Sequence, residues 1–339
     1  MRLLGGRNLK AFEEEIASYI GTRYAFGVAS GSDALLLGLV AAGIGQGDEV
    51  ILHANAFMAA VEAIKWVGAR PILVDASEDD FGPDPEQVHR AISPKTKAVI
   101  VVHMYGHPAD LDPLLELRQR HGFKLIEDCS HAHGAEYKGR KVGSFGDVGC
   151  FSCGVVKNLG AFGDAGFCTT DDPEVARKLD LLRVHGQVKK NQHLFYGFNS
   201  RLDEIQAAVL RIRLRLLDSD NRRRQEIAAL YTEAFRKLDG LIPPPEFPDR
   251  KSVYHRYVVR TKKREELRAF LKERGVETGI QYPLPLHMQD AWLGEGYGKY
   301  HLPVAERICS EVLSLPLYPE LTDEEVQYVI EKVTEFFRG

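Results

Sequence analysis

The sequence predicts an α/β protein, with a large domain built on a mostly parallel β-sheet and a smaller α+β domain at the C-terminal end. The chain has 339 residues, more than a single small core accommodates. Short apolar runs alternate with helical patterns throughout the first half. A proline-rich segment, Leu241–Pro248, then separates this part from a C-terminal part in which strand and helix patterns are mixed.

The composition is that of a globular protein and excludes several functional classes. Hydrophobic residues make up 44% of the chain and charged residues 27%, with a net charge of −4. The basic clusters Arg211–Arg215 and Arg222–Arg224 have helical spacing, which indicates a solvated or interface face rather than a nucleic-acid track. No apolar run has the length of a membrane span, and Met1–Gly6 lacks the features of an export signal. We therefore expect a cytoplasmic protein that binds neither nucleic acid nor membrane.

The apolar runs of the first half are predicted to be strands of one sheet. Their near-continuous apolar character is typical of parallel strands that helices cover on both faces. The expected strands are Ala25–Ala29, Val50–His53, Pro71–Asp75, Ala98–His103, Lys124–Asp128, Gly149–Cys153 and Gly166–Thr170. The expected helices between them are Asp33–Ala42, Ala56–Val67, Asp84–Ala91 and Asp110–His121. Asp84 and Asp110 are expected N-caps, and Gly122 is expected to end its helix.

The second half is predicted to begin with one long connecting helix from Asp203 to about Leu238, because this stretch contains neither proline nor glycine. We assign residues 1–238, with this helix, to the large domain and residues 249–339 to the small one. The elements expected in the small domain are a strand Tyr254–Val259, a helix Arg264–Arg274, a loop Tyr282–His287, and helices Val304–Val312 and Asp323–Phe337.

The five cysteines are an odd number and are predicted to be reduced thiols. Cys150 and Cys153 form the one close pair, but they lie in a strand-like run, where residues three apart point to opposite faces. No second pair is present to complete a zinc site. We therefore expect no bound metal.

The first candidate site lies where a strand gives way to a helix, at Ser30–Asp33. Ligands of doubly wound sheets bind beyond the carboxyl ends of the strands. Gly31 allows the backbone to approach an anion, which the Ser32 hydroxyl and the free N–H groups of the helix can bind. An ordinary N-cap at Ser32 or Asp33 is an equally good interpretation.

Two further candidates are Asp128, at the end of an apolar strand, and Lys157, in a glycine-rich turn between two strands. A carboxylate at a strand end can pair with a protonated ring nitrogen, although a salt bridge or helix cap is the alternative. A lysine amine forms imines with carbonyl groups, although most lone lysines are surface residues. With Ser152 shortly before Lys157, the order of anion loop, acid and lysine is typical of pyridoxal phosphate enzymes of the aspartate-aminotransferase fold type, fold type I.

Several motifs make the chain similar to the DegT/DnrJ/EryC1/StrS family of sugar aminotransferases, over nearly its whole length. The motifs are Gly27–Leu35, Glu127–Gly134, Phe151–Leu159 and Gly197–Ala208. The resemblance implies a homodimer with shared active sites that uses pyridoxal 5′-phosphate. It also implies transfer of an amino group from glutamate to a nucleotide-linked keto-deoxysugar. The run Tyr196–Leu210 most resembles members that aminate the 3-position of dTDP-sugars.

The resemblance also implies roles for individual residues. Lys157 corresponds to the Schiff-base lysine and Asp128 to the acid at the pyridine nitrogen. The other implied cofactor contacts are Gly31, Ser32, Asp33 and Ser152 at the phosphate, Phe57 stacked on the ring, His131 beside the ring oxygen, and Asn199, which reaches the phosphate in the partner subunit. His287 corresponds to a small-domain histidine near the substrate entrance. Core packing is the alternative for Phe57, and a structural role is the alternative for His287.

The chain departs from the family pattern at three places. The family usually has glutamine at the position of His131, whose charge could titrate. Aromatic residues or histidine often occupy the positions of Cys153 and Gly154, so we expect a more open wall beside the lysine. Relatives also carry a helix and a gating segment before the position of Leu3. These departures concern the substrate contacts rather than the cofactor.

Other functions on the same scaffold stay open. Sugar 3-dehydratases of the family carry histidine at the lysine position, so Lys157 favours amination over dehydration. Aminotransferases that act on cyclitols, or that make an aminobenzoate precursor, are alternatives. A catalytically silent, cofactor-binding regulator is the alternative from a different functional class.

Overall fold

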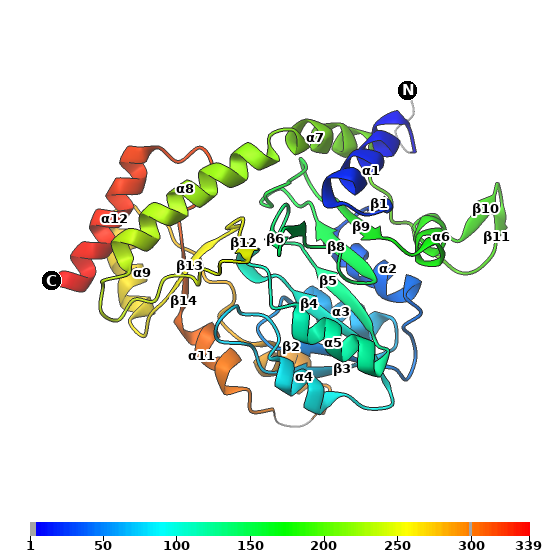
Figure 1. The fold of residues 1–339 in the computed structure, drawn as a ribbon, viewed down its shortest axis with the longest axis horizontal. Coiled ribbons are helices and arrows are strands. Elements are labelled where there is room, and N and C mark those ends of the chain that lie inside the picture. The colour runs from blue at the N-terminus through cyan, green and yellow to red at the C-terminus, as the bar shows by residue number, and fades with distance from the viewer. Residues whose placement is uncertain (1–4, 298–299) are drawn as a thin grey trace.

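A computed structural model describes residues 5–297 and 300–339 of the chain (Figure 1). The position of Leu3 lies outside the described residues. A seven-stranded sheet forms the centre, in the order β1-β9-β8-β5-β4-β2-β3, and every strand predicted in the first half belongs to it. The strands are β1 Tyr24–Val28, β2 Glu49–His53, β3 Arg70–Val74, β4 Thr96–Val102, β5 Lys124–Asp128, β8 Val148–Ser152 and β9 Gly166–Thr170.

The sheet is mostly parallel, as predicted. Strands β8, β5, β4, β2 and β3 pair in parallel, while β9 is antiparallel to both β1 and β8. Alternate strand residues feed two apolar clusters, one under α2, α3 and α6 and the other under α1, α5 and α7. The helices of this part are α1 Arg7–Ile20, α2 Gly31–Ala41, α3 Met58–Trp66, α4 Pro85–Ala91, α5 Asp112–His121, α6 Pro173–Leu182 and α7 Glu204–Leu214. None of the helices described is both long and apolar enough to cross a membrane.

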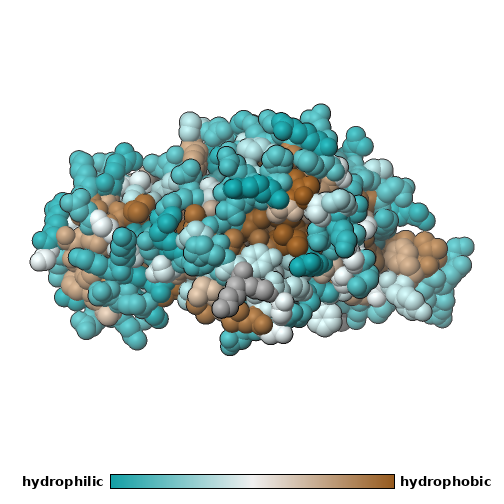
Figure 2. All heavy atoms as spheres, turned by 90° about the horizontal axis from the view of Figure 1, so that it is seen from below, coloured by the Kyte–Doolittle hydropathy of each residue, from teal (hydrophilic) through white to brown (hydrophobic). Residues whose placement is uncertain are grey.

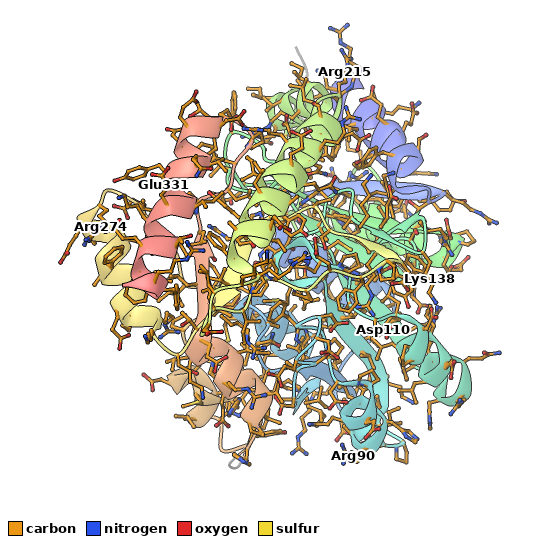
Figure 3. All side chains as sticks on the ribbon, turned by 60° about the vertical axis from the view of Figure 1, so that its left-hand side comes forward. Arg90, Asp110, Lys138, Arg215, Arg274 and Glu331 are labelled. Atoms are coloured by element: carbon orange, nitrogen blue, oxygen red, sulfur yellow. The ribbon has the colours of Figure 1, made fainter. Side chains whose placement is uncertain are left out.

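The predicted helix caps are confirmed at two of three positions. The Asp84 carboxylate accepts the first free N–H groups of α4, and Gly122 ends α5 with a positive φ of 73°. The N-cap predicted at Asp110 is wrong. Pro113 lies in the first turn of α5, where proline is tolerated, and the helix begins at Asp112. Asp110 instead accepts a hydrogen bond from Tyr137 and lies at the surface (Figure 3).

The long helix predicted from Asp203 is two helices, α7 and α8 Leu217–Phe235, with a turn at Arg215 and Leu216 (Figure 3). No proline or glycine marks the turn. The two halves bury their apolar residues in different clusters, α7 under the large sheet and most of α8 among the C-terminal elements. The proposed division at residue 238 thus keeps α8 with the large domain, although its buried face belongs mainly to the C-terminal cluster.

The C-terminal part contains an antiparallel strand pair covered by helices (Figure 1). The pair is β13 Tyr257–Arg260 and β14 Val312–Leu315, and the helices are α9 Arg264–Glu273, α11 Pro303–Glu311 and α12 Asp323–Arg338. Strand β14 was not predicted, because it continues directly from α11. The short elements are β6 Glu136–Tyr137, β7 Arg140–Lys141, β10 Gln187–Lys189, β11 Gln192–His193, β12 Arg250–Lys251, η1 Met104–Gly106, η2 Leu286–Met288 and α10 Asp290–Leu293.

A buried carboxylate, Glu127, ties the end of β5 to its surroundings. It accepts hydrogen bonds from His103 Nε2 at 3.1 Å and from the N–H groups of Gly143, Phe145 and Gly146 at 2.8, 2.8 and 2.7 Å. Burial opposes the charge, but these donors outweigh it and hold the pKa of Glu127 below its usual value. Cys129 lies beside His103 and Glu127, and these three residues have a spacing that could hold a metal ion. The Glu127 carboxylate is already satisfied by N–H donors, so we interpret the three residues as a structural cluster.

Replacing Glu127 by alanine should destabilise the fold. The substitution leaves buried N–H groups without an acceptor, which we expect to lower the free energy of unfolding by about 3–5 kcal/mol. Urea unfolding followed by circular dichroism measures the loss. Glu116→Ala is the matched control, because it removes an exposed carboxylate paired with Arg120, and should cost less than about 1 kcal/mol. Equal losses for the two variants would contradict the role given to Glu127.

Candidate active site

Lys157 lies in the loop between β8 and β9, in a turn where its N–H donates to Gly154 O at 2.9 Å. Burial lowers the pKa of its amine to about 8; Asp128 opposes this decrease and Arg256 adds to it. A lysine amine with such a pKa is partly neutral near physiological pH, and the neutral form is the one that attacks a carbonyl carbon.

Asp128 is the last residue of β5 and is almost completely buried, with 5% of its surface exposed. One carboxylate oxygen accepts the N–H of Ser130 at 3.0 Å, which is the local cap expected of an aspartate at a strand end. The other oxygen receives no hydrogen bond from the described residues. This oxygen is therefore available to a protonated ring nitrogen. The carboxylate is also close enough to Lys157 for its charge to raise the pKa of the amine.

The N-terminus of α2 forms an anion cradle against Ser152. A Cβ atom on Gly31 would lie 2.4 Å from Ser152 Cβ, so only glycine allows this approach. The N-cap of α2 is Ser30, whose Oγ accepts the Asp33 N–H at 3.1 Å. Neither Ser32 nor Asp33, the two N-caps considered from the sequence, caps this helix. The N–H groups of Gly31 and Ser32 belong to the open first turn, where a phosphate binds well.

Asp33 connects the cradle to the segment that carries Asn199. Its N–H is engaged by Ser30, and its carboxylate accepts the Ser200 hydroxyl at 2.7 Å. Ser200 in turn accepts the Ala29 N–H at 3.1 Å. Asn199 itself is exposed at the surface. The position predicted to reach a partner subunit is therefore held next to the cradle of its own subunit, pointing away from the core.

His131 is buried and stacks on His255, with ring centroids 4.6 Å apart and an interplanar angle of 20°. Asn158 fixes His255, because Asn158 Nδ2 donates to Asn221 Oδ1 and Val253 O and so leaves its Oδ1 to accept from His255 Nδ1 at 3.1 Å. Burial, and then nearby positive charge, lowers the pKa of both histidines well below the usual value. This shift favours the neutral ring and argues against titration of the charge of His131.

Phe57 precedes α3 and exposes 53% of its surface, which excludes the core role considered for it. Its ring lies 5.3 Å from that of Tyr282, tilted by 31°. Burial, and then the charge of Asp128, raises the pKa of Tyr282 to about 12, so this hydroxyl stays protonated. From the sequence, Tyr282–His287 is predicted only as a loop, although the aromatic residue at its start is a signal for a site residue.

His287 lies in η2, and its position fits a structural role. The side chain is 5% exposed, and its Nε2 lies 3.1 Å from Glu306 Oε1 in α11. The adjacent Leu286 N–H donates to Ala54 O at 2.7 Å, which attaches this loop to the segment after β2. A contact between His287 and substrate stays a prediction.

These groups fit the cofactor that the motifs imply. The cradle at Gly31 and Ser152 suits a phosphate, the open oxygen of Asp128 suits a pyridine N–H, and the amine of Lys157 suits an aldehyde. His131 Nδ1 is buried without a hydrogen-bond partner in the described part of the chain, so this atom is available to a polar group of the cofactor. Each feature lies at the carboxyl end of a strand or in the segment that directly follows it.

Comparison with known proteins identifies the family. The chain matches the DegT/DnrJ/EryC1/StrS aminotransferase family over residues 2–334. It belongs to this family. It is 47% identical to a dTDP-3-amino-3,4,6-trideoxy-alpha-D-glucose transaminase of Streptomyces venezuelae, over 99% of this chain and 88% of the relative. It is also 44% identical to a protein of Geobacillus stearothermophilus named pleiotropic regulatory protein, over 99% of this chain and 91% of the relative.

A solved structure has the same fold. The crystal structure of S. venezuelae DesV in complex with a ketimine intermediate superposes with a TM-score of 0.97 and 46% identity, over 100% of this chain and 91% of that one. The α/β fold, the family and the aminotransferase activity predicted from the sequence are thereby confirmed. Enzymes of this family depend on pyridoxal phosphate.

The lowered pKa of Lys157 predicts how the protein takes up its cofactor. The rate of loading apo-protein with pyridoxal phosphate should rise with pH and level off above about 8, where the amine is already neutral. Stopped-flow absorbance at a series of pH values measures this profile. A rate that still climbs about tenfold per pH unit between about pH 9 and 10 would indicate an ordinary lysine and contradict the assignment.

Proposed function

We propose that the protein is a pyridoxal 5′-phosphate-dependent aminotransferase that transfers an amino group from L-glutamate to a nucleotide-linked keto-deoxysugar. The observation that carries the proposal is the partly buried Lys157, with its lowered pKa, beside Asp128 and the cradle at Gly31. The transaminase from Streptomyces supports a dTDP-sugar and its 3-position as the acceptor.

Each residue of the site has a separate role in the reaction. When bound, the cofactor supplies an aldehyde that takes up the amino group and a ring that accepts electrons. Lys157 acts as base and then acid, moving the proton between the donor's Cα and the C4′ atom. Asp128 holds a proton on the ring nitrogen, and the N–H groups of Gly31 and Ser32 with the Ser152 hydroxyl hold the phosphate.

The side chains around this centre fix its orientation and exclude water. His131, neutral and stacked on His255, offers one ring nitrogen to the ring oxygen of the cofactor without adding charge. Phe57 is exposed where a flat ring can stack on it, and Tyr282 closes the space beside it. Cys153 is buried against His133, at 3.9 Å, so its thiol lines the inner wall rather than the open space.

We also propose a homodimer with shared sites, in which Asn199 reaches the partner's phosphate cradle. Asn199 is exposed, and Tyr196 beside it is fully exposed at 101%. The loop before Lys157 exposes Val155 and Val156 at 61% and 63%, and burying such side chains is favourable. Figure 2 shows a further apolar patch toward the end of the molecule that carries the β10–β11 hairpin.

Two alternatives retain support. A cyclitol or another keto compound without a nucleotide is compatible with the same catalytic groups. The relative named pleiotropic regulatory protein supports a silent regulator. The presence of both Lys157 and Asp128 favours catalysis, because a protein that only binds the cofactor needs neither a proton carrier nor an electron sink.

The central test follows the visible absorption of the cofactor-loaded protein. Adding L-glutamate should shift the band in the wild type, while Lys157→Ala should show no shift. Asp128→Ala should keep some cofactor but lose at least about 100-fold in turnover, since it removes the group that keeps the ring protonated. A loaded wild type that responds to no amino donor would support the regulator instead, and an active Asp128→Ala would refute the role of that carboxylate.

Mixing two inactive variants tests the shared site. Asn199→Ala and Lys157→Ala each damage one contribution, so a hybrid dimer has one site with both residues intact. We expect recovery of up to about half the wild-type activity per hybrid dimer, one site of two, as C2 symmetry dictates. Co-expression with two different affinity tags isolates the hybrids. Purified hybrids that stay inactive would show that each site is built from one chain.

A further inference from the structure

Arg256 comes from the small domain and faces the catalytic centre. Its N–H donates to Tyr105 O at 3.2 Å, which ties its backbone to Tyr105, and the Tyr105 hydroxyl donates in turn to Gln281 O at 2.6 Å. The preceding residue, His255, stacks on His131. Arg256 is thus attached to the wall that also carries the histidine pair.

The guanidinium of Arg256 has no acidic partner among the described residues. No carboxylate of the described residues forms an ion pair with it, and it donates no side-chain hydrogen bond to them. The neighbouring Arg224 differs, because its guanidinium donates to the carbonyls of Tyr254 and Leu317. Arg256 is partly buried, and burial lowers its pKa. A cation held in this way gains most from an anion that arrives from outside.

The positive charge of Arg256 acts on the catalytic groups. It lowers the pKa of Lys157, His131 and His255, so its head group lies within electrostatic reach of all three. Asp128 opposes this effect at Lys157. Glu277, Glu324 and Glu325 line the adjoining cavity, but none of them forms an ion pair with Arg256. Positive charge in a concave site concentrates anionic ligands.

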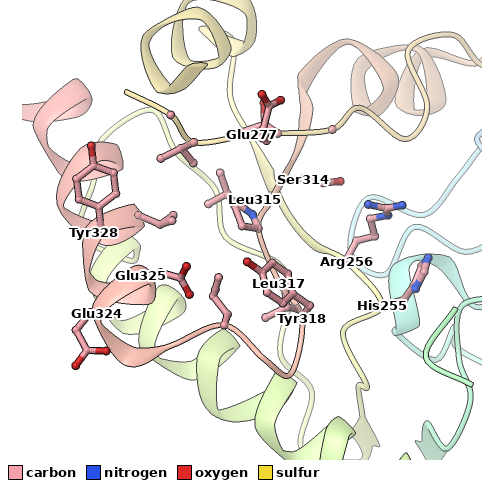
Figure 4. Close-up of a pocket in the computed structure, with 17 residues that line it drawn as sticks. His255, Arg256, Glu277, Ser314, Leu315, Leu317, Tyr318, Glu324, Glu325 and Tyr328 are labelled. Carbon is pink, nitrogen blue, oxygen red and sulfur yellow. The ribbon is translucent and has the colours of Figure 1, made fainter. Parts of the chain in front are cut away.

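Arg256 also borders the large cavity of the small domain. This cavity has a volume of about 700 Å³, within the size of sites for small ligands. Figure 4 shows Arg256 and His255 at one end and Tyr328 and Glu324 at the other. Arg256 is the only arginine or lysine among the described residues that line the cavity. Among the described residues, an anion in this cavity therefore has Arg256 as its one arginine or lysine, next to the His255 that stacks on His131.

We propose that Arg256 binds the anionic group of a substrate, either the carboxylate of the amino donor or the diphosphate of the nucleotide sugar, and so orients the reacting end toward Lys157. The inference rests on the proposed function, since that reaction supplies both anions. The planar guanidinium matches either group with paired hydrogen bonds. Both substrates must occupy the same site in turn, so one cation can serve both.

Calorimetry with unreactive anions tests the assignment on the cofactor-loaded protein. Glutarate represents the donor's carboxylates, and inorganic pyrophosphate represents the diphosphate. Arg256→Gln should weaken binding of at least one probe by about tenfold or more, and Arg256→Lys should give a smaller loss because it keeps the charge but not the planar fork. Arg268→Gln removes an arginine that is 51% exposed on α9, and this control should change neither affinity.

The outcomes separate the two sources of the anion. A loss confined to glutarate assigns Arg256 to the amino donor, a loss confined to pyrophosphate assigns it to the nucleotide sugar, and losses for both make it a shared anchor. Affinities within about twofold of the wild type for both probes, or no binding of either probe by the wild type, overturn the proposal. Cofactor content and thermal midpoint verify folding, and Arg256→Lys carries the test if Arg256→Gln does not fold.

The same measurements keep this inference distinct from the proposed function. The probes bind without reacting, so their affinities do not depend on transamination. A wild type that binds glutarate through Arg256 but shows no spectral response to any amino donor would contradict the aminotransferase proposal alone. A wild type that reacts with L-glutamate while Arg256→Gln keeps its KM would contradict the role of Arg256 at the donor carboxylate alone.

Discussion

The buried carboxylate of Glu127 is the constraint on which the geometry of the site depends. Successive residues of a strand point to opposite faces, so whatever fixes Glu127 on one face also fixes Asp128 on the other. His103 and the loop from Gly143 to Gly146 provide that fixation through four hydrogen bonds to a group that could not otherwise be buried. A slip of one residue in β5 would exchange the two carboxylates and direct the wrong one at the catalytic centre.

Desolvation then sets the charge state of the centre. Burial disfavours whichever form is charged, so the same environment makes the amine of Lys157 partly neutral and keeps the rings of His131 and His255 neutral. This explains how histidine is accommodated where the family usually has glutamine. A flat, neutral ring stacked on a second ring offers hydrogen-bonding nitrogen without a second cation beside the lysine. Cys153, also buried and with a raised pKa, likewise adds no charge.

Local sequence patterns determined how much of the fold and of the site could be predicted. The strands were predictable because parallel strands buried on both faces are apolar throughout, and Lys157 and Asp128 were predictable because they lie in sequence motifs at strand ends. The break between α7 and α8 and the strand β14 carry no proline, glycine or change of pattern, and only packing against two separate cores defines them. Three residues of the site that were missed come from other parts of the chain and meet the motifs only after folding: His255, Arg256 and Tyr282. Asn158 lies inside the motif Phe151–Leu159, but its hydrogen bond to His255 exists only in the folded chain.

The residues of the site come from two parts of the chain, and this origin has a chemical reason. In the proposed function, the groups that hold the cofactor within one subunit come from the strands of the large sheet and the segments that follow them, and the close approach of Gly31 to Ser152 leaves no room for a side chain at position 31. The C-terminal part of the chain supplies Arg256 and the wall of the cavity, which can differ between relatives without disturbing the cofactor end. An enzyme that accepts two unlike substrates in turn needs such an arrangement, because the proton transfer at Lys157 is common to both half-reactions while the anions that deliver each substrate are not. We therefore expect substrate choice in this chain to depend on Arg256 and the other residues that line the cavity, which lie outside the sequence motifs.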